Sequence, residues 1–157
     1  IRRNRAANHF TTYNRPDVVE KAQDILSAVA ALSLHADLSA VSVCGVGEAG
    51  LWALLAAAAD PAGIRRLAID LAGFEPGLDA EFVERLNIPH IRRAGDLTTA
   101  VALYAPRPLL AFYAGDRFDP SAFRAIYRAC GKPEALSVRK GPVSDRKLAD
   151  FLAVKGG

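Results

Sequence analysis

The segment CGVGEAG, residues 44–50, carries three glycines at the spacing of a phosphate-binding loop. Gly45, Gly47 and Gly50 match the pattern G-x-G-x-x-G and stand between a short apolar run and a longer one. Such glycines allow a tight turn, a close approach of a pyrophosphate and the packing of a helix on a strand. Asp70 follows Gly50 by twenty residues, where an acid would bind a ribose hydroxyl. One interpretation is therefore a protein that binds NAD or FAD.

Two features weigh against this Rossmann-like interpretation. Glu48 places a carboxylate in the loop where the phosphate charge would lie, although acids are also common at helix N-termini because of the helix dipole. The glycine pattern normally opens its domain, whereas here the sequence predicts a helix before it. The same turn therefore calls for a second interpretation.

A strand–turn–helix crowded with small residues also occurs as the nucleophile elbow G-x-S-x-G, in which a strained turn presents a nucleophile above a sheet. On that pattern Gly45 takes the first glycine position and Ala49 the second. Gly47 takes the nucleophile position, and Glu48 follows it directly. The serine is missing.

Three segments resemble α/β-hydrolases of the acetylxylan-esterase and dienelactone-hydrolase kind. The segment AVALYAPRPLLAFYAGDRFDP is similar to the part of that family in which a helix leads into APRPLL, a strand and the loop of the triad acid. TYNRPDVVEKAQDILSAVAAL and GEAGLWALLAAAADP resemble the helices before and after the nucleophile strand. The resemblance spans residues 12–152 and only the C-terminal half of the family's fold. It implies that the earlier strands, and the loop that supplies half of the oxyanion hole, lie upstream.

The resemblance assigns catalytic roles to positions that lack the expected side chains. The nucleophile position is Gly47, which has no side chain to attack a substrate. The triad acid is implied at Asp119, with the nearby Asp116 as the other choice. The base histidine is implied directly after the glycine of RKGPVSD, where Pro142 stands. Without serine and histidine no acyl-enzyme can form, because an aspartate alone only orients a base.

The resulting prediction is a degenerate α/β-hydrolase-like domain related to carboxylic (acetyl) ester hydrolases, non-catalytic as it stands, with a structural or binding role. Neither a cofactor nor a metal is expected under this interpretation. Two alternatives stay open. One is a nucleotide-binding protein that uses the three glycines and Asp70 for NAD or FAD. The other is an active esterase completed by residues outside this chain.

Other residues with chemical potential receive plainer interpretations. Cys44 is predicted to be a buried, inert thiol, Trp52 a core residue and Glu48 a solvated acid at a helix start. The remaining candidates are predicted to lie in loops or on solvated faces: His9, His35, His90, Arg65, Arg66, Arg92 and Arg93.

The elements that must position these residues alternate along the chain. The hydrophobic pattern predicts helices over residues 15–32, 50–63, 79–87, 95–105, 119–130 and 144–154. It predicts strands over residues 38–45, 64–73, 106–115 and 134–140. This alternation indicates an α/β fold, a parallel sheet of about four strands flanked by helices in three αβα layers. Under the resemblance it is a partial α/β-hydrolase fold.

The two main interpretations predict different strand orders. In the hydrolase-like fold the four strands follow one another across the sheet. The strand AVSV then lies at an open edge, which an upstream half or a second copy of the chain would cover. In the nucleotide-binding fold a switch point lies beside the glycine turn, with other strands on its far side.

Length, composition and charge narrow the class of protein. A chain of 157 residues with 51% hydrophobic content indicates one domain, here a half-domain over residues 16–157 after a basic, extended lead-in over residues 1–15. Apart from the four arginines of that lead-in, 16 basic residues face 17 acidic ones, so binding to nucleic acid is not expected. No apolar stretch reaches the roughly 20 residues of a membrane helix.

The chain contains no methionine, so we expect a processed product or a piece of a longer protein. Its localisation is left open.

Overall fold

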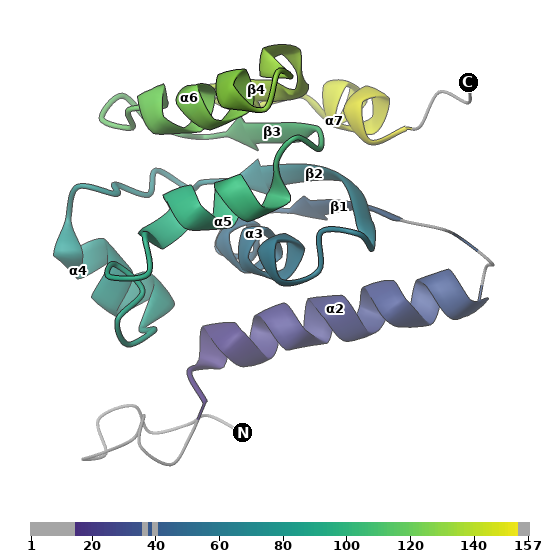
Figure 1. The fold of residues 1–157 in the computed structure, drawn as a ribbon, viewed down its shortest axis with the longest axis horizontal. Coiled ribbons are helices and arrows are strands. Elements are labelled where there is room, and N and C mark those ends of the chain that lie inside the picture. Colours follow the sequence, from purple (N-terminus) through teal and green to yellow (C-terminus); the bar gives the residue numbers. More distant parts are fainter. Residues whose placement is uncertain (1–14, 36–37, 39–40, 154–157) are drawn as a thin grey trace.

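The computed structural model describes residues 15–35, 38 and 41–153, so the predicted lead-in lies outside the described residues except for its last position. Four strands form one sheet: β1 (Val41–Gly45), β2 (Ile64–Asp70), β3 (Leu109–Phe112) and β4 (Leu136–Val138). All neighbouring pairs are parallel, and the order is β1-β2-β3-β4 (Figure 1). The predicted α/β fold is confirmed. The strand order is the one that the hydrolase-like interpretation predicts, and the described strands contain no switch point.

Six α-helices flank this sheet in the described part of the chain, giving three layers. They are α2 (Asp17–His35), α3 (Ala49–Ala59), α4 (Asp79–Glu81), α5 (Asp96–Tyr104), α6 (Ser121–Ala129) and α7 (Asp145–Leu152). Helix α4 runs directly into a π-helical turn, η1 (Phe82–Leu86), and a 3-10 turn, η2 (Pro133–Ala135), precedes β4.

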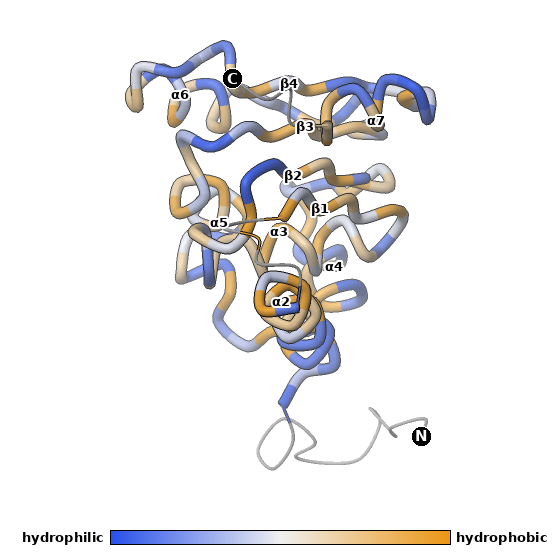
Figure 2. Tube along the Cα trace, turned by 90° about the vertical axis from the view of Figure 1, so that its right-hand side faces the viewer, coloured by the Kyte–Doolittle hydropathy of each residue, from blue (hydrophilic) through white to orange (hydrophobic). Residues whose placement is uncertain are grey.

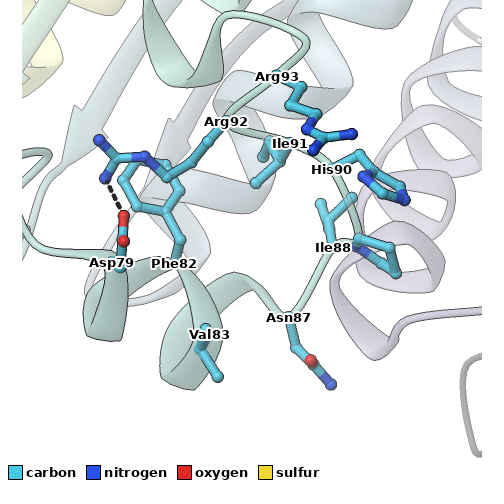
Figure 3. A pocket seen from close by; sticks show the side chains of 10 residues that line it. Asp79, Phe82, Val83, Asn87, Ile88, His90, Ile91, Arg92 and Arg93 are labelled. Atoms are coloured by element: carbon cyan, nitrogen blue, oxygen red, sulfur yellow. Dashed lines mark ion pairs between the residues drawn. The ribbon is translucent and has the colours of Figure 1, made fainter.

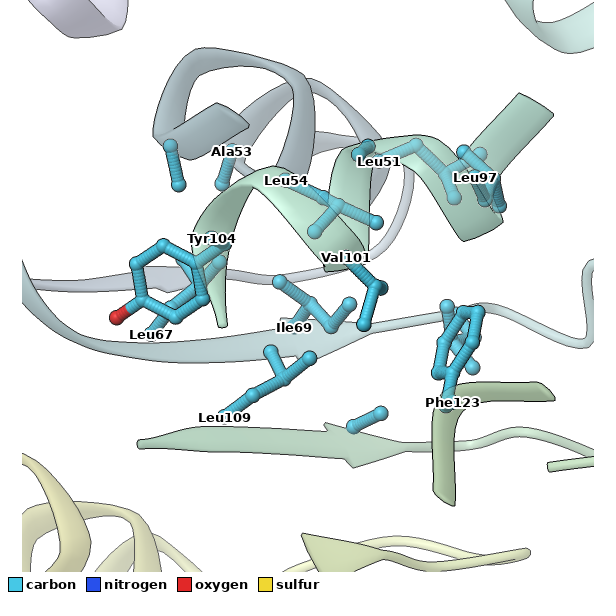
Figure 4. Close-up of a cluster of buried hydrophobic side chains, with 14 of the residues drawn as sticks. Leu51, Ala53, Leu54, Leu67, Ile69, Leu97, Val101, Tyr104, Leu109 and Phe123 are labelled. Atoms are coloured by element: carbon cyan, nitrogen blue, oxygen red, sulfur yellow. The ribbon is translucent and has the colours of Figure 1, made fainter. Parts of the chain in front are cut away.

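The larger part of the core lies between one face of the sheet and helices α3, α5 and α6. Leu67, Ile69 and Leu109 point to this face from β2 and β3 and are fully buried. Leu54 of α3 and Val101 of α5 belong to the same cluster (Figure 4). Burying each large aliphatic side chain contributes about 2 kcal/mol, so this packing holds α3 firmly against the sheet.

The opposite face is covered by α7 alone among the described helices. Ala68, Leu110 and Phe112 form a second buried cluster there, against which apolar residues of α7 pack. The Arg66 guanidinium donates a hydrogen bond of 3.0 Å to the Phe151 carbonyl and lies 5.8 Å from the centroid of its ring. Figure 2 shows α6 and α7 on opposite sides of the sheet.

Helix α2 confirms the helix predicted over residues 15–32 and is amphipathic. Val18, Ala22 and Val29 are buried along one side of the helix, which packs on α3. Near its C-terminal end, Leu32 and Leu34 are exposed by 55% and 86%. The helix therefore contacts the domain along one narrow stripe.

Several predicted elements are shorter in the structure. The strand predicted over 106–115 is confined to β3, because Pro106 and Pro108 lack an N–H and Tyr113 turns the chain into the left-handed region with φ 51°. The strand predicted over 134–140 is confined to β4, because η2 occupies its first residues.

The other boundaries shift for similar reasons. The strand predicted over 64–73 ends at Asp70, because Ala72 and Gly73 adopt left-handed backbone conformations. The helix predicted over 50–63 ends at Ala59, before the Asp-Pro pair. The helix predicted over 79–87 divides into α4 and η1, and β1 begins at Val41, with residues 39–40 outside the described part.

Candidate functional site

The residues that the two main interpretations assign to a site lie at the carboxyl edge of the sheet. Since all four strands are parallel, the segments that follow them meet at this edge. Backbone hydrogen bonds extend the ladder beyond the strands: Gly73 N–H donates to the Tyr113 carbonyl (2.8 Å), and Tyr113 N–H donates to the Gly141 carbonyl (3.0 Å). The loops after β2, β3 and β4 are therefore joined to one another.

Gly47 is the apex of the turn between β1 and α3. Its φ is +61°, in the left-handed region that glycine adopts without strain. A Cβ at this position would meet no atom within 4 Å. A side chain on Gly47 would therefore project into open space at the carboxyl edge, which is how a nucleophile elbow presents its residue.

The flanking glycines are required by close packing. A Cβ on Gly45 would lie 2.7 Å from the Gly50 Cα, and a Cβ on Gly50 would lie 2.7 Å from the Asp70 N and closer still to its carbonyl oxygen. Helix α3 thus meets the backbone of β2 at Gly50. The elbow pattern assigns its second small residue to Ala49. In the structure the residue packed against the backbone of β2 is the next one, Gly50. Contact of this kind is the role of the third glycine in a nucleotide-binding loop.

Asp70 ties the turn to the next strand. It is 6% exposed, its Oδ2 accepts a hydrogen bond from Gly47 N–H (3.0 Å), and its Oδ1 accepts one from Ala72 N–H (2.7 Å). The nucleotide-binding interpretation assigns this carboxylate to a ribose hydroxyl. Here both of its oxygens accept hydrogen bonds from backbone groups of the same domain.

Glu48 stands at the N-terminal end of α3. Its side chain is exposed, and it makes no capping hydrogen bond to the described part of the chain. Its backbone carbonyl accepts the first helical hydrogen bond, from Leu51 N–H (3.2 Å). This placement agrees with a solvated acid at a helix start.

The two candidate acids after β3 have partners of their own. Asp119 accepts hydrogen bonds from the Ser121 hydroxyl (2.8 Å) and the Ser121 N–H (2.9 Å) at the start of α6. These hydrogen bonds, the one from the hydroxyl first, lower the pKa of the Asp119 carboxyl below its ordinary value. Asp116 forms an exposed ion pair with Lys140 at 3.2 Å. Asp119 therefore works as the cap of α6.

Pro142 lies in the loop after β4 and is exposed. The carbonyl of the preceding Gly141 is the acceptor for Tyr113 N–H, so this loop is held against the loop after β3. Proline has no group that can accept or donate a proton at this position. The place implied for the base therefore has no acid–base side chain.

One property of this edge, its left-handed backbone, has no signal in the local sequence pattern. Five residues with positive φ lie directly after β1, β2 and β3: Gly47, Ala72, Gly73, Tyr113 and Gly115. Two of these residues carry side chains, and Tyr113 is 45% exposed. Non-glycine residues in the left-handed region are uncommon and concentrate at functional or tightly constrained sites.

The prediction that Cys44 is buried is wrong. The side chain is exposed because β1 is an edge strand of the described sheet and Cys44 lies on the face that, among the described helices, α7 alone covers. Partial burial, and then the charge of Asp70, raise the pKa of the Cys44 thiol above its ordinary value. A raised pKa favours the protonated thiol, which is the less nucleophilic form, and burial is the larger of its two causes.

The other candidates lie away from this edge. Trp52 packs against the main core, as predicted, and its buried indole N–H finds no acceptor among the described residues. His35 ends α2, and His90 is exposed in the loop before α5. His9 lies outside the described residues.

In each of the two arginine pairs, one guanidinium contacts another part of the domain. Arg65 and Arg93 are exposed. Arg66 is held by α7, and Arg92 forms an ion pair of 3.0 Å with Asp79. The prediction of solvated faces therefore holds for Arg65, Arg92 and Arg93, whereas Arg66 is half-buried.

Three cavities lined by described residues lie elsewhere. One of about 430 Å³ is formed by η1 and the loop before α5, one of about 540 Å³ lies beside Arg66 and Phe151, and one of about 400 Å³ lies beside α6 and β4. None of these three is lined by Gly47, Asp70 or Pro142.

Within residues 15–35, 38 and 41–153, no group of three or more histidine, cysteine or acidic side chains could hold a metal ion. No helix in the same part of the chain is long and apolar enough to cross a membrane. No known family matches the sequence, and neither a curated protein nor a solved structure shows significant similarity to it.

Proposed function

We propose that this chain is a degenerate α/β-hydrolase-like domain, related to carboxylic ester hydrolases, that has no esterase activity and serves a structural or binding role. One observation carries the proposal: the turn at Gly47 has a left-handed apex directed into open space at the carboxyl edge, and the apex has no side chain. The backbone is arranged for a nucleophile, and the nucleophile is absent.

The rest of the implied triad supports the same conclusion. Asp119 is occupied in capping α6, and Pro142 offers no base. Cys44 lies near the turn, but the raised pKa of its thiol keeps it protonated. The described residues at this edge therefore lack a group that could form an acyl intermediate and a group that could move its proton.

The binding role is assigned to the open edge of β1. Val41 N–H donates to the Gly63 carbonyl, toward β2. Since backbone groups alternate in direction along a strand, those of Ser42 and Cys44 point away from β2. Such an edge pairs readily with another strand. We assign it to a strand from the upstream half of the same fold, and pairing with a second copy of the chain is the competing outcome.

A serine-directed fluorophosphonate probe tests the catalytic part of the proposal. The unaltered chain should be neither labelled nor active on 4-nitrophenyl acetate. The double variant Gly47→Ser/Pro142→His should be labelled, although slowly. The resemblance implies that half of the oxyanion hole lies upstream, and loss of one oxyanion donor alone costs about 10²-fold in rate. The control is Gly73→Ser/Pro142→His, since Gly73 also has a positive φ (+67°) and open space at its Cβ. Labelling of the unaltered chain, or equal labelling of both variants, would contradict the proposal.

Proline substitutions in β1 test the binding part. Cys44→Pro removes an N–H that points outward, so it should abolish association while the fold persists. Val43→Pro removes an N–H directed toward β2 and should unfold the domain. Material from the native source is analysed by light scattering and denaturing gel, which identify either a second polypeptide or a homodimer. A 157-residue monomer at all concentrations tested would overturn the assignment.

The nucleotide-binding alternative keeps one specific observation, the contact of Gly50 with the backbone of Asp70. The engaged carboxylate of Asp70 and the strand order favour the hydrolase-like interpretation instead. A thermal-shift measurement with NAD and FAD distinguishes the two. A clear stabilisation that is lost in Gly47→Val would favour the nucleotide site.

A further inference from the structure

The cavity formed by η1 and the loop before α5 has features of a ligand site that are independent of the carboxyl edge. Its volume of about 430 Å³ lies within the range of small-molecule pockets. Phe82, Val83, Ile88 and Ile91 give it an apolar lining, and Val83 is 65% exposed within it. A cavity of this kind would bury the apolar body of a small ligand.

The walls are fixed by contacts within the segment. The Arg92 guanidinium lies 4.8 Å from the centroid of the Phe82 ring, pairs with Asp79 at 3.0 Å and donates to the Pro76 carbonyl at 3.1 Å. Phe82 in turn packs edge-on against the buried ring of Phe74, with their centroids 5.0 Å apart. The floor is therefore preformed.

The backbone around the cavity is unusual. Its apolar floor comes from a π-helical turn, and such turns are found frequently at functional sites. Asn87 ends this turn with φ 48°, and His90 has φ 61°. Both are non-glycine residues in the left-handed region. His90 is held there by its carbonyl, which accepts hydrogen bonds from Arg93 N–H (2.9 Å) and Ala94 N–H (3.1 Å). These hydrogen bonds fix the loop at the rim.

The charges of the lining are unevenly distributed. At one end Arg92 is neutralised by Asp79. Figure 3 shows His90 and Arg93 at the opposite end. Arg93 is exposed and forms no ion pair with any described residue. The cavity therefore combines an apolar floor with one uncompensated guanidinium and an imidazole donor at its rim.

We propose that this cavity binds a small carboxylate with an aromatic or aliphatic body. The body lies on Ile88 and Ile91, and the carboxylate accepts hydrogen bonds from Arg93 and His90. A guanidinium binds a planar carboxylate through two parallel hydrogen bonds, which gives the charged group a fixed orientation. A neutral ligand of the same shape would leave the guanidinium unpaired.

Titration calorimetry and backbone NMR with the full chain test the proposal. The probes are 4-phenylbutyrate and octanoate, with 4-phenylbutanamide as the neutral counterpart. The acids should bind and shift the amide signals of residues 82–93, and the amide should bind roughly tenfold more weakly or worse, since a charge-assisted hydrogen bond is lost. Binding of the amide as tight as that of the acid would overturn the proposal, as would shifts confined to other regions or no binding of either acid.

Two variants and one control localise the effect. Arg93→Gln should weaken binding of 4-phenylbutyrate roughly tenfold. Val83→Glu places a negative charge within the apolar lining and should abolish it. Arg65→Gln, at an exposed arginine on β2, should leave it unchanged. Melting curves check that each variant is folded. Equal effects of Arg93→Gln and Arg65→Gln would show that the site is not in this cavity.

Discussion

The backbone N–H of Gly47 donates a hydrogen bond of 3.0 Å to the carboxylate of Asp70, which is 23 residues further along the chain. This bond links the apex of the turn after β1 to the end of β2. It also occupies the acid that a nucleotide-binding loop would leave free for a ribose. The same contact thus stabilises the turn and argues for a structural role of Asp70.

Replacing Asp70 should test how much this link contributes. In Asp70→Asn one acceptor oxygen becomes an amide donor that faces a backbone N–H. We expect the free energy of unfolding to fall by about 2 kcal/mol, since hydrogen bonds to buried charged groups are among the strongest. Urea unfolding measures the loss. The matched control is Asp116→Asn, which removes an exposed ion pair and should change stability little. Equal effects of the two variants would refute the role given to Asp70.

The glycines of the turn should differ in their tolerance of a methyl group. Gly50→Ala forces a Cβ into the backbone of Asp70 and should cost about 3 kcal/mol, because neither backbone can yield cheaply. Gly47→Ala has open space and should cost only the left-handed backbone strain, about 1 kcal/mol. Gly141→Ala has open space and no positive φ, so it should be neutral. Unfolding midpoints that rank Gly47→Ala as the most damaging would contradict this account.

The cap formed by Asp119 should depend on pH. Because the pKa of this carboxyl is lower in the folded chain, its stabilising effect is complete above the pKa of the unfolded chain. The effect disappears as pH falls through the folded value. Asp119→Ala should therefore destabilise the domain at neutral pH and have progressively less effect between about pH 4 and pH 2. Thermal melting of both forms across that range measures the difference. A constant difference down to pH 2 would show that the carboxylate charge is not involved.

The thiol of Cys44 should respond to the neighbouring carboxylate. It is exposed, yet its partial burial and the charge of Asp70 keep its pKa high, so iodoacetamide should alkylate it slowly at neutral pH. In a Cys130→Ser background, Asp70→Asn should accelerate alkylation severalfold, and Asp116→Asn should not. Mass spectrometry over time gives both rates. An unchanged rate in Asp70→Asn would leave burial as the whole cause.

The fold was predictable where the sequence carries a local pattern. Apolar runs that alternate with amphipathic ones predicted each strand and helix, and the four buried residues of β3 fit a strand covered on both faces. The end of β3 was not predictable, because Tyr113, in its left-handed conformation, accepts a hydrogen bond from the loop after β2 and donates one to the loop after β4. Boundaries of this kind arise from tertiary contacts.

The candidate site was predictable only as a set of positions. Parallel strands alone bring Gly47, Asp119 and Pro142 to one edge. The exposure of Cys44 depends on which strand lies at the edge of the sheet, and no local pattern records that. The role of Asp119 had a local signal that was missed: Asp-Pro-Ser before an amphipathic run is a helix start with an acid as its cap. The cavity beside η1 had none, because its form depends on a π-helical turn and two left-handed residues.

The simple strand order has a consequence for how the chain acquires its structure. Each new strand joins the edge formed by the strand just before it in sequence, and none has to insert between two strands already paired. Pairing therefore involves only strands that are consecutive in sequence, and the sheet can grow during synthesis as the ribosome releases β1 through β4 in turn. Until β2 emerges, β1 lacks its neighbour in this sheet, and an unpaired strand of this kind is exposed to aggregation.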